Sequence, residues 1–185
     1  ASGSPRRREL LEMLGVPDMT IRPAKGPERA TPGAGPEQTV RELALHKAQE
    51  VAQTCAPEDI VIAADTIVYL DGVILGKPKD TADAARMLAA LSGREHTVYT
   101  GVAVLRGGET RLAAEHTAVR FRTLTPEEIT RYIATGEPMD KAGAYGIQGR
   151  GALFVAHLDG DYFNVMGLPL CRLGQLLNEL GVELL

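Results

Sequence analysis

The chain has 185 residues, and 44% of them are apolar, which is enough to form a hydrophobic core without disulfide bonds. It carries 20 Lys and Arg against 24 Asp and Glu, so its net charge of −4 offers no general attraction to a polyanion or an anionic membrane. With 3 Phe, 5 Tyr and 0 Trp, it also has few rings with which to stack nucleic-acid bases. A nucleic-acid partner and a membrane partner are therefore both disfavoured.

The length is that of one domain, and we expect residues 1–185 to form a single domain. Cys55 and Cys171 lie far apart, with no further Cys or His at metal-ligand spacing, so a zinc site is not expected and the thiols are interpreted as reduced. No apolar run reaches about 18 residues, and no secretory leader opens the chain. These features predict a cytoplasmic protein.

The first half of the chain predicts two helices and a flexible insert. Ser4 is a suitable N-cap with Pro5 in the first helical position, and Gly15 ends this helix. The stretch 23–36 is rich in Pro and Gly, and we interpret it as a mobile loop near a site. The second helix runs from Pro36 to about Ala52, because its apolar residues recur at helical spacing.

A continuous apolar run at 60–64 then predicts a strand that is buried on both faces and ends on Asp65. Residues 66–70 and 73–75 flank Asp71-Gly72, which is a signal for a two-residue hairpin. The rest of the chain predicts further helices and strands. A helix from Asp80 to Gly93 is followed by strands at 97–105 and 110–121, and then by a helix that a capping box opens at Thr125 and Gly136 closes. A strand at 152–157 and a terminal helix at 169–180 complete the predicted elements. The predicted fold class is therefore α/β, with a mixed sheet flanked by helices.

The first candidate site is the start of the chain, where Ser2, Ser4, Arg6 and Arg7 surround the beginning of a helix. Free N–H groups, two hydroxyls and two guanidiniums at a helix N-terminus suit a phosphate chain. The alternative is a pair of solvated surface arginines. The apolar residues that follow at +3, +4 and +7 place Arg7 on the buried face, which favours the first interpretation.

Two lysines and one carboxylate could meet the same anion. Lys47 lies on the apolar stripe of the second helix, where it needs an anion unless its stem carries it to the rim. Asp65 and Thr66 follow the most apolar strand, where a carboxylate can hold Mg²⁺ or deprotonate water, or can simply end the strand. Lys77 could bring a second ammonium group to the same anion.

A glycine-rich segment at 143–151 allows close approach of the backbone to a ligand, although it is neither a P-loop nor a dinucleotide fingerprint. Gln148 within it carries a donor and an acceptor on one amide, which could pair with the C=O and N–H edge of uracil or thymine. The alternative is a flexible loop with a solvated glutamine. The histidines form no nucleophilic arrangement, so we interpret them as structural.

Taken together, these segments resemble the Maf family of nucleoside-triphosphate pyrophosphatases along nearly the whole chain. The segments that carry the resemblance are Ala1-Ser2-Gly3-Ser4-Pro5-Arg6-Arg7, His46-Lys47-Ala48, Ala64-Asp65-Thr66, Gly76-Lys77-Pro78, Ser92-Gly93-Arg94, Tyr99-Thr100-Gly101-Val102, Gly136-Glu137-Pro138, Asp140-Lys141-Ala142-Gly143, Tyr145-Gly146-Ile147-Gln148-Gly149 and Gly167-Leu168-Pro169-Leu170.

The resemblance implies a fold shared with the inosine-triphosphate pyrophosphatases, with two lobes around a cleft, and a reaction that converts NTP and water to NMP and pyrophosphate. It also implies the branch that acts on dTTP and UTP, since Arg6, Thr66 and Gln148 match its selectivity positions. The alternatives are the branch that prefers 7-methyl-GTP and a non-catalytic nucleotide-binding regulator linked to septum inhibition. A homodimer is a further implication.

The mechanism that we expect uses Arg6, Arg7, Lys47 and Lys77 to neutralise the triphosphate. A divalent cation, Mg²⁺ or Mn²⁺, is expected to bridge phosphate oxygens and carboxylates, and the resemblance places Glu28 beside Asp65 as a metal ligand. Asp65 is expected either to act as the general base for the attacking water or to ligate the metal. Thr66 and Gln148 are expected to select the pyrimidine, with Ser2 and Ser4 also contacting the substrate.

Overall fold

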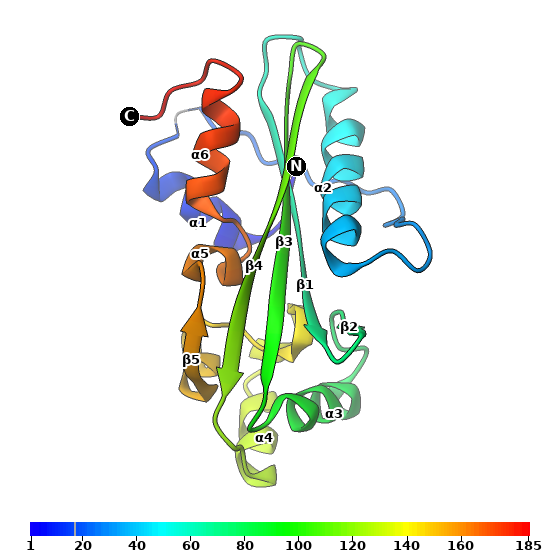
Figure 1. Ribbon diagram of the computed structural model, residues 1–185, viewed down its shortest axis with the longest axis vertical. Coiled ribbons are helices and arrows are strands. Elements are labelled where there is room, and N and C mark those ends of the chain that lie inside the picture. The colour runs from blue at the N-terminus through cyan, green and yellow to red at the C-terminus, as the bar shows by residue number, and fades with distance from the viewer. Residues whose placement is uncertain (17) are drawn as a thin grey trace. The chain divides into compact units, whose positions relative to one another are not determined.

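The computed structural model describes residues 1–16 and 18–185. It confirms the α/β fold class: helices flank a five-stranded sheet with the strand order β2-β1-β3-β4-β5 (Figure 1). The strands are β1 (Val61–Leu70), β2 (Val73–Leu75), β3 (Glu95–Arg106), β4 (Glu109–Phe121) and β5 (Val155–Asp159). The helices are α1 (Pro5–Met13), α2 (Pro36–Ala52), α3 (Thr81–Leu91), α4 (Pro126–Ile133), α5 (Tyr162–Met166) and α6 (Leu170–Asn178), with 3₁₀ turns η1 (Glu137–Asp140), η2 (Ala142–Ala144) and η3 (Gly149–Phe154).

The described residues form two compact units, and each is assembled from segments that are distant in sequence. The first unit comprises Ala1–Thr66, Thr100–Glu115 and Gly167–Leu185, and the second comprises Ile67–Tyr99 and His116–Met166. The expected single domain and the expected cleft stay predictions.

The core of the first unit packs α2 against the sheet. Buried small residues of α2, including Ala44 and Ala48, meet Val61 and Ala63 of β1 and Ala103 of β3. Small side chains allow the helix to lie close to the strands, and the backbone comes closest at Gly101. A Cβ on Gly101 would lie 2.2 Å from the carbonyl oxygen of Val40, so only glycine fits there. This contact fixes the distance between α2 and β3.

The core of the second unit is aromatic. The ring of Phe121 makes edge-on contacts with Tyr145 and Phe154 at centroid distances of 4.7 and 5.8 Å. His96 lies in the same core, and its Nε2 is 2.7 Å from the hydroxyl oxygen of Tyr145. Burial lowers the pKa of His96 to about 4, so the ring is neutral at physiological pH. The buried position of His96 agrees with its interpretation as a structural residue.

The predicted hairpin is confirmed, because β1 and β2 pair antiparallel around Asp71 and Gly72, whose φ angles are 48° and 85°. Two strand predictions are wrong in their bounds. The strand β1 does not end at Asp65 but continues to Leu70, since the Asp65 carboxylate is paired inside the strand as described below. The last strand begins at Val155, because 149–154 form the turn η3.

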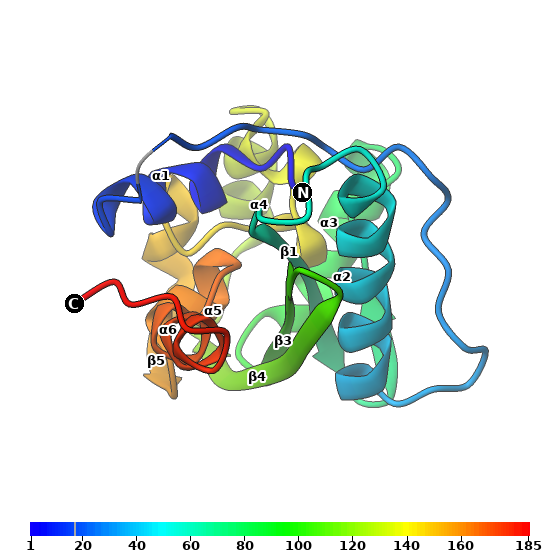
Figure 2. The ribbon, with the colours of Figure 1, turned by 90° about the horizontal axis from the view of Figure 1, so that it is seen from above.

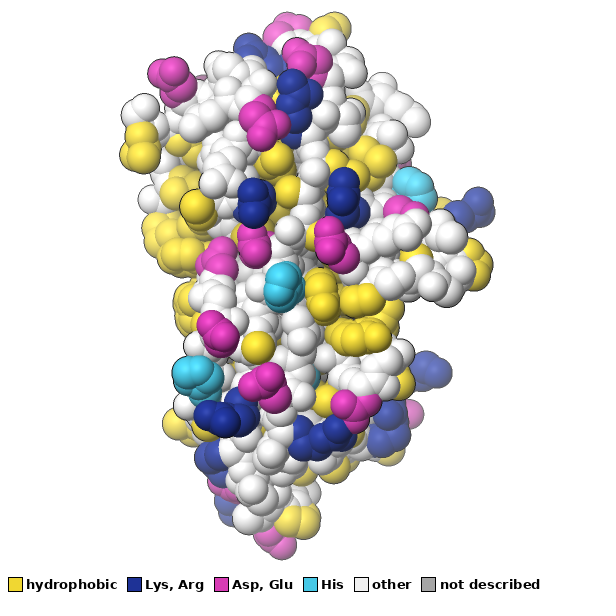
Figure 3. Space-filling view, in the orientation of Figure 1, with side chains coloured by type: hydrophobic (Ala, Val, Ile, Leu, Met, Phe, Trp, Pro, Cys, Tyr) yellow, Lys and Arg dark blue, Asp and Glu magenta, His cyan; other side chains and the backbone are white. Residues whose placement is uncertain are grey.

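None of the helices among the described residues combines the length and the apolar character that a membrane span requires. The face shown in Figure 3 carries interspersed cationic and anionic side chains.

Candidate active site

The N-terminal turn is held by Ser2. We expected Ser4 to cap α1, and Ser4 does occupy the N-cap position, but its side chain makes no capping hydrogen bond. Instead, the backbone N–H of Ser4 donates to Oγ of Ser2 at 3.2 Å. The prediction of Ser4 as the N-cap residue is therefore confirmed in position, although its hydroxyl makes no capping hydrogen bond.

Arg7 holds three segments of the first unit together. Its Nε donates to the carbonyl oxygen of Gly167 at 2.7 Å, its Nη1 to Oγ of Ser2 at 3.0 Å, and its Nη2 to Oγ1 of Thr66 at 3.0 Å. Burial lowers the pKa of Arg7, while the charge of Asp65 raises it, and an arginine remains protonated in proteins. Arg7 thus places a fixed positive charge behind Thr66, in the middle of β1.

Thr66 is oriented by a second hydroxyl that the sequence analysis missed. Oγ1 of Thr66 lies 2.9 Å from Oγ1 of Thr100 in β3, and Thr100 is fully buried. Thr66 therefore lies between Arg7 and Thr100, which restricts its hydroxyl to one position. The position of Thr100 just before the apolar residues 102–105 of the predicted strand was the signal that could have identified it.

Lys47 lies between two carboxylates. Its Nζ contacts Oδ1 of Asp65 on one side and Oε1 of Glu28, at 2.7 Å, on the other. The side chain of Lys47 is 20% exposed, that of Asp65 is 11% exposed and that of Glu28 is 64% exposed. Lys47 therefore meets the anion that its place on the apolar face of α2 required, and Glu28 reaches the cluster from the solvent side.

Asp65 is the carboxylate whose protonation is most affected by this arrangement. Burial raises its pKa above the ordinary value for an aspartic acid, and Glu28 raises it further, while the charges of Lys47 and Arg7 lower it. Because burial outweighs the two cations, the pKa shift is upward. A carboxylate with a raised pKa is a better proton acceptor near neutral pH than a solvated one.

The loop that carries Glu28 runs on the outer side of α2 (Figure 2), and it is joined to this helix by hydrogen bonds at two points. The carboxylate of Glu50 accepts hydrogen bonds from the backbone N–H groups of Lys25 and Gly26, at 2.7 and 2.9 Å. The carboxylate of Glu42 accepts from the N–H of Thr31 at 2.7 Å. Glu28 lies between these two attachments.

The other predicted residues are divided between the units. Arg6 and Ser4 are half-buried in the first unit, and the charge of Arg6 contributes to the lowered pKa of Arg7. Lys77 and Gln148 belong to the second unit, where Lys77 is exposed and Gln148 is half-buried. The first unit therefore brings together the predicted residues Ser2, Arg7, Glu28, Lys47, Asp65 and Thr66. A shared role with Lys77 and Gln148 stays a prediction.

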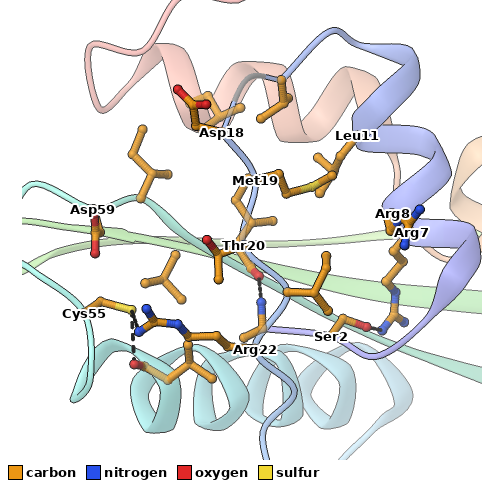
Figure 4. A pocket seen from close by; sticks show the side chains of 18 of the residues that line it. Ser2, Arg7, Arg8, Leu11, Asp18, Met19, Thr20, Arg22, Cys55 and Asp59 are labelled. Carbon is orange, nitrogen blue, oxygen red and sulfur yellow. Dashed lines mark hydrogen bonds between the residues drawn. The ribbon is translucent and has the colours of Figure 1, made fainter.

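A cavity of about 520 Å³ lies beside the N-terminal turn in the first unit. Figure 4 shows Ser2 and Arg7 at its edge, together with Leu11 of α1 and Met19. The described residues that line it are mostly apolar, and they do not include Lys47 or Asp65. A mostly apolar lining is unsuited to a triphosphate, so the cavity is not the expected phosphate site, although Ser2 and Arg7 line it as well.

The glycine-rich segment approaches other parts of the protein. A Cβ on Gly151 would lie 2.3 Å from the carbonyl oxygen of Gly146, and one on Gly149 would lie 2.9 Å from the Glu137 carboxylate. These two glycines are therefore required by contacts within the second unit, and their spacing does not by itself indicate a ligand.

The comparisons with known proteins extend over nearly the whole chain. A family model described as "Maf-like protein" matches residues 1–180. The chain is 55% identical to the dTTP/UTP pyrophosphatase of Moorella thermoacetica, an alignment that covers 99% of this chain and 94% of the relative. It is 52% identical to the dTTP/UTP pyrophosphatase of Symbiobacterium thermophilum, over 98% of this chain and 92% of the relative. The chain therefore belongs to the Maf-like protein family.

Proposed function

We propose that the chain hydrolyses dTTP and UTP to the nucleoside monophosphate and pyrophosphate. A water oxygen forms a bond to the α-phosphorus, the bond from that phosphorus to the α–β bridging oxygen breaks, and pyrophosphate leaves. Relatives that are half identical over nearly the whole chain and are named dTTP/UTP pyrophosphatase support this reaction. The observation that carries it is the buried carboxylate of Asp65 beside two cations.

Lys47 and Asp65 have different roles in this proposal: Lys47 binds the phosphate, and Asp65 accepts the proton. In the free protein the Lys47 ammonium is satisfied by Asp65 and Glu28, and triphosphate oxygens compete for the same three N–H donors. When Lys47 turns its donors to the phosphate, the Asp65 carboxylate loses a partner and accepts a proton from the attacking water. Arg7, fixed behind Thr66, stabilises the negative charge that develops on the phosphoryl group.

The donor set suits a divalent cation that arrives with the nucleotide. Glu28 and Asp65 supply carboxylate oxygens, which Mg²⁺ and Mn²⁺ prefer. Among the described residues there is no group of three or more His, Cys, Asp or Glu that could hold a metal. Two carboxylates with phosphate oxygens and water match the way in which Mg²⁺ binds at phosphate sites. When bound, the ion neutralises charge on the leaving pyrophosphate. Metal ligation by Asp65 is the alternative to its role as base.

The choice of base is assigned to Arg6, Thr66 and Gln148, with Lys77 as a further contact to the phosphates. The Gln148 amide offers one donor and one acceptor, which complement the C=O and N–H of uracil or thymine. A site with polar groups that must be paired rejects the wrong base more strongly than an apolar slot does.

The proposal extends to the setting of the enzyme. Residues 1–185 act as one functional domain, without a nucleic-acid or membrane partner, in keeping with the net charge of −4. The cysteines Cys55 and Cys171 are free, which supports a cytoplasmic enzyme. A homodimer follows from the family resemblance alone.

The test is a substrate panel with the full chain and Mg²⁺. Pyrophosphate release is measured from dTTP, UTP, CTP, ATP, GTP and 7-methyl-GTP, with chromatography to identify the monophosphate. We expect kcat/KM for dTTP and UTP to exceed the purine values by at least about tenfold. Preference for 7-methyl-GTP, release of diphosphate and phosphate, or binding without turnover would each overturn the proposal. The variant Asp65→Asn, assayed in parallel, shows whether the activity belongs to this chain.

A further inference from the structure

In the second unit, the carboxylate of Glu137 holds the main chain that directly follows Gln148. The backbone N–H of Arg150 donates to Oε2 of Glu137 at 3.1 Å, and the N–H of Gly151 donates to Oε1 at 3.1 Å. One side chain from η1 thus fixes two successive peptide groups of η3. Gln148 is the N-cap residue of η3, two positions before the first of these donors.

Tyr132, at the end of α4, completes the same arrangement from the other side. Its hydroxyl donates to Oε1 of Glu137 at 2.9 Å and accepts from the backbone N–H of Gly146 at 3.3 Å. Tyr132 is only 4% exposed, so its hydroxyl is fixed by the aromatic core around it. Glu137 and Tyr132 therefore bind the chain both before and after Gln148.

The glycines of the segment fit closely against these two side chains. A Cβ on Gly151 would lie 2.7 Å from the Tyr132 hydroxyl oxygen, and Gly149 has φ of +72° beside the Glu137 carboxylate. Burial raises the pKa of Glu137, but the N–H groups of Gly151 and Arg150 and the Tyr132 hydroxyl lower it more, so the net shift is downward. Glu137 is thus held as a carboxylate that only accepts hydrogen bonds.

We propose that Glu137, supported by Tyr132, is a positioning residue that fixes the Gln148 amide and thereby sets the preference for pyrimidine bases. This inference rests on the proposed function, in which Gln148 reads the base. A base-reading amide must be held within about 0.5 Å of its productive place, and a glycine-rich chain does not hold it without external support. The carboxylate and the tyrosine hydroxyl supply that support without contacting the substrate.

The test compares substrate ratios in a mutant cycle. In Glu137→Gln, one of the two acceptor oxygens becomes an NH₂ group that faces a backbone N–H donor, which loosens the turn after Gln148. We expect the ratio of kcat/KM for UTP to that for GTP to fall about threefold to tenfold. In a Gln148→Ala background, Glu137→Gln should cause no further fall, because its effect passes through the Gln148 amide.

The variant Glu128→Gln is the matched control. Glu128 also accepts from a backbone N–H, that of Thr125, and it binds Arg122 in the same unit, but its bonds lie in the capping box of α4. It should lose stability and keep the wild-type ratio. Tyr132→Phe provides a second route should Glu137→Gln fail to fold, and it should lower the ratio in the same direction.

Each remaining outcome decides a different question. An unchanged ratio in Gln148→Ala would remove the base-reading role and the inference with it. A lower ratio in Gln148→Ala with an unchanged one in Glu137→Gln and Tyr132→Phe would overturn the positioning role alone. An equal fall in the Gln148→Ala background, or in Glu128→Gln, would show that Glu137 acts by general loosening of the unit, and would also overturn the inference.

Discussion

Two carboxylates have pKa values that are shifted in opposite directions. Asp65 lies in the first unit in a cluster with Glu28 and Lys47, and Glu137 lies in the second unit against the turn at 150–151. Burial raises the pKa of Asp65 and outweighs the charge of Lys47, its ion-pair partner, which lowers it. The pKa of Glu137 is lowered, because its partners are two backbone N–H groups and a hydroxyl. The difference lies in whether burial or the hydrogen-bond donors and cations around the carboxylate have the larger effect, and not in the residue type.

Partners that are attached to flexible side chains can be exchanged for a substrate, whereas backbone donors cannot. Lys47 can turn from Asp65 to a phosphate oxygen with a rotation of its own side chain. The N–H groups of Arg150 and Gly151 can leave Glu137 only if the turn unfolds. The first carboxylate is therefore suited to chemistry, and the second is suited to holding a shape.

The largest effect should come from the Asp65 carboxylate itself. Asp65→Asn keeps an oxygen that can accept from Lys47 but removes the proton acceptor, so kcat for UTP hydrolysis should fall by about 10²–10⁴. The KM and the unfolding midpoint should change little. Glu12→Gln, which breaks an exposed ion pair with Arg8, is the control and should retain full activity. Near wild-type turnover by Asp65→Asn would assign the catalytic role to another group.

The next effect concerns Lys47 and pH. Lys47→Met removes a cation from the phosphate and should lower kcat/KM about 100-fold. Because the ammonium lowers the pKa of Asp65, its loss raises that pKa further. The carboxylate form is the active one, so the acidic limb of the pH–rate profile should move to higher pH. A limb that stays in place, or moves to lower pH, would contradict the role of Asp65 as the base.

A smaller effect is expected from Thr100, which orients Thr66. Thr100→Val keeps the shape but removes one hydrogen bond, and kcat/KM should fall about fivefold, the equivalent of about 1 kcal/mol. Thr117→Val is matched to it, since Thr117 is also fully buried and its hydroxyl accepts from Asn164 in the second unit. The control should lower stability and leave kcat/KM unchanged. Equal losses of activity in both variants would mean that Thr100 has only a structural role.

The smallest effect should come from the attachment of the Glu28 loop. Glu50→Ala removes the acceptor for the N–H groups of Lys25 and Gly26, and the KM for UTP should rise about twofold to threefold, since exposed contacts of this kind contribute little. Gln49→Ala changes an exposed neighbour on the same helix and should leave the KM unaltered. A KM that stays constant in both would show that Glu28 needs no fixed loop.

Local patterns in the sequence predicted most of the elements but not the extent of β1. The helix Pro36–Ala52, the hairpin at Asp71-Gly72 and the capping box at Thr125 were confirmed, because each depends on residues that are close in sequence. The apolar run at 60–64 stops at Asp65 and so predicts the end of a strand there, whereas β1 continues to Leu70. The partner of Asp65, Lys47, precedes it by 18 residues, so the pairing is not visible in a local pattern.

The site was predictable in part for the same reason. The position of Lys47 on the apolar face of α2 predicted an anion, and the structure supplies Asp65. Thr100 and the carbonyl of Gly167 were missed, because a buried hydroxyl and a backbone oxygen acquire a role only through tertiary contacts. The close approach at Gly149 and Gly151 was predicted, but the groups that approach them belong to the protein itself.

The hydrogen bond from Arg7 to the carbonyl of Gly167 joins residues that are 160 positions apart. Translation proceeds at about 5–20 residues per second, so Gly167 is made many seconds after Arg7. Unfinished chains therefore lack one of the three acceptors that hold its guanidinium, however early α1 has formed. Competence for hydrolysis should therefore not appear before Gly167 has been made and can reach Arg7.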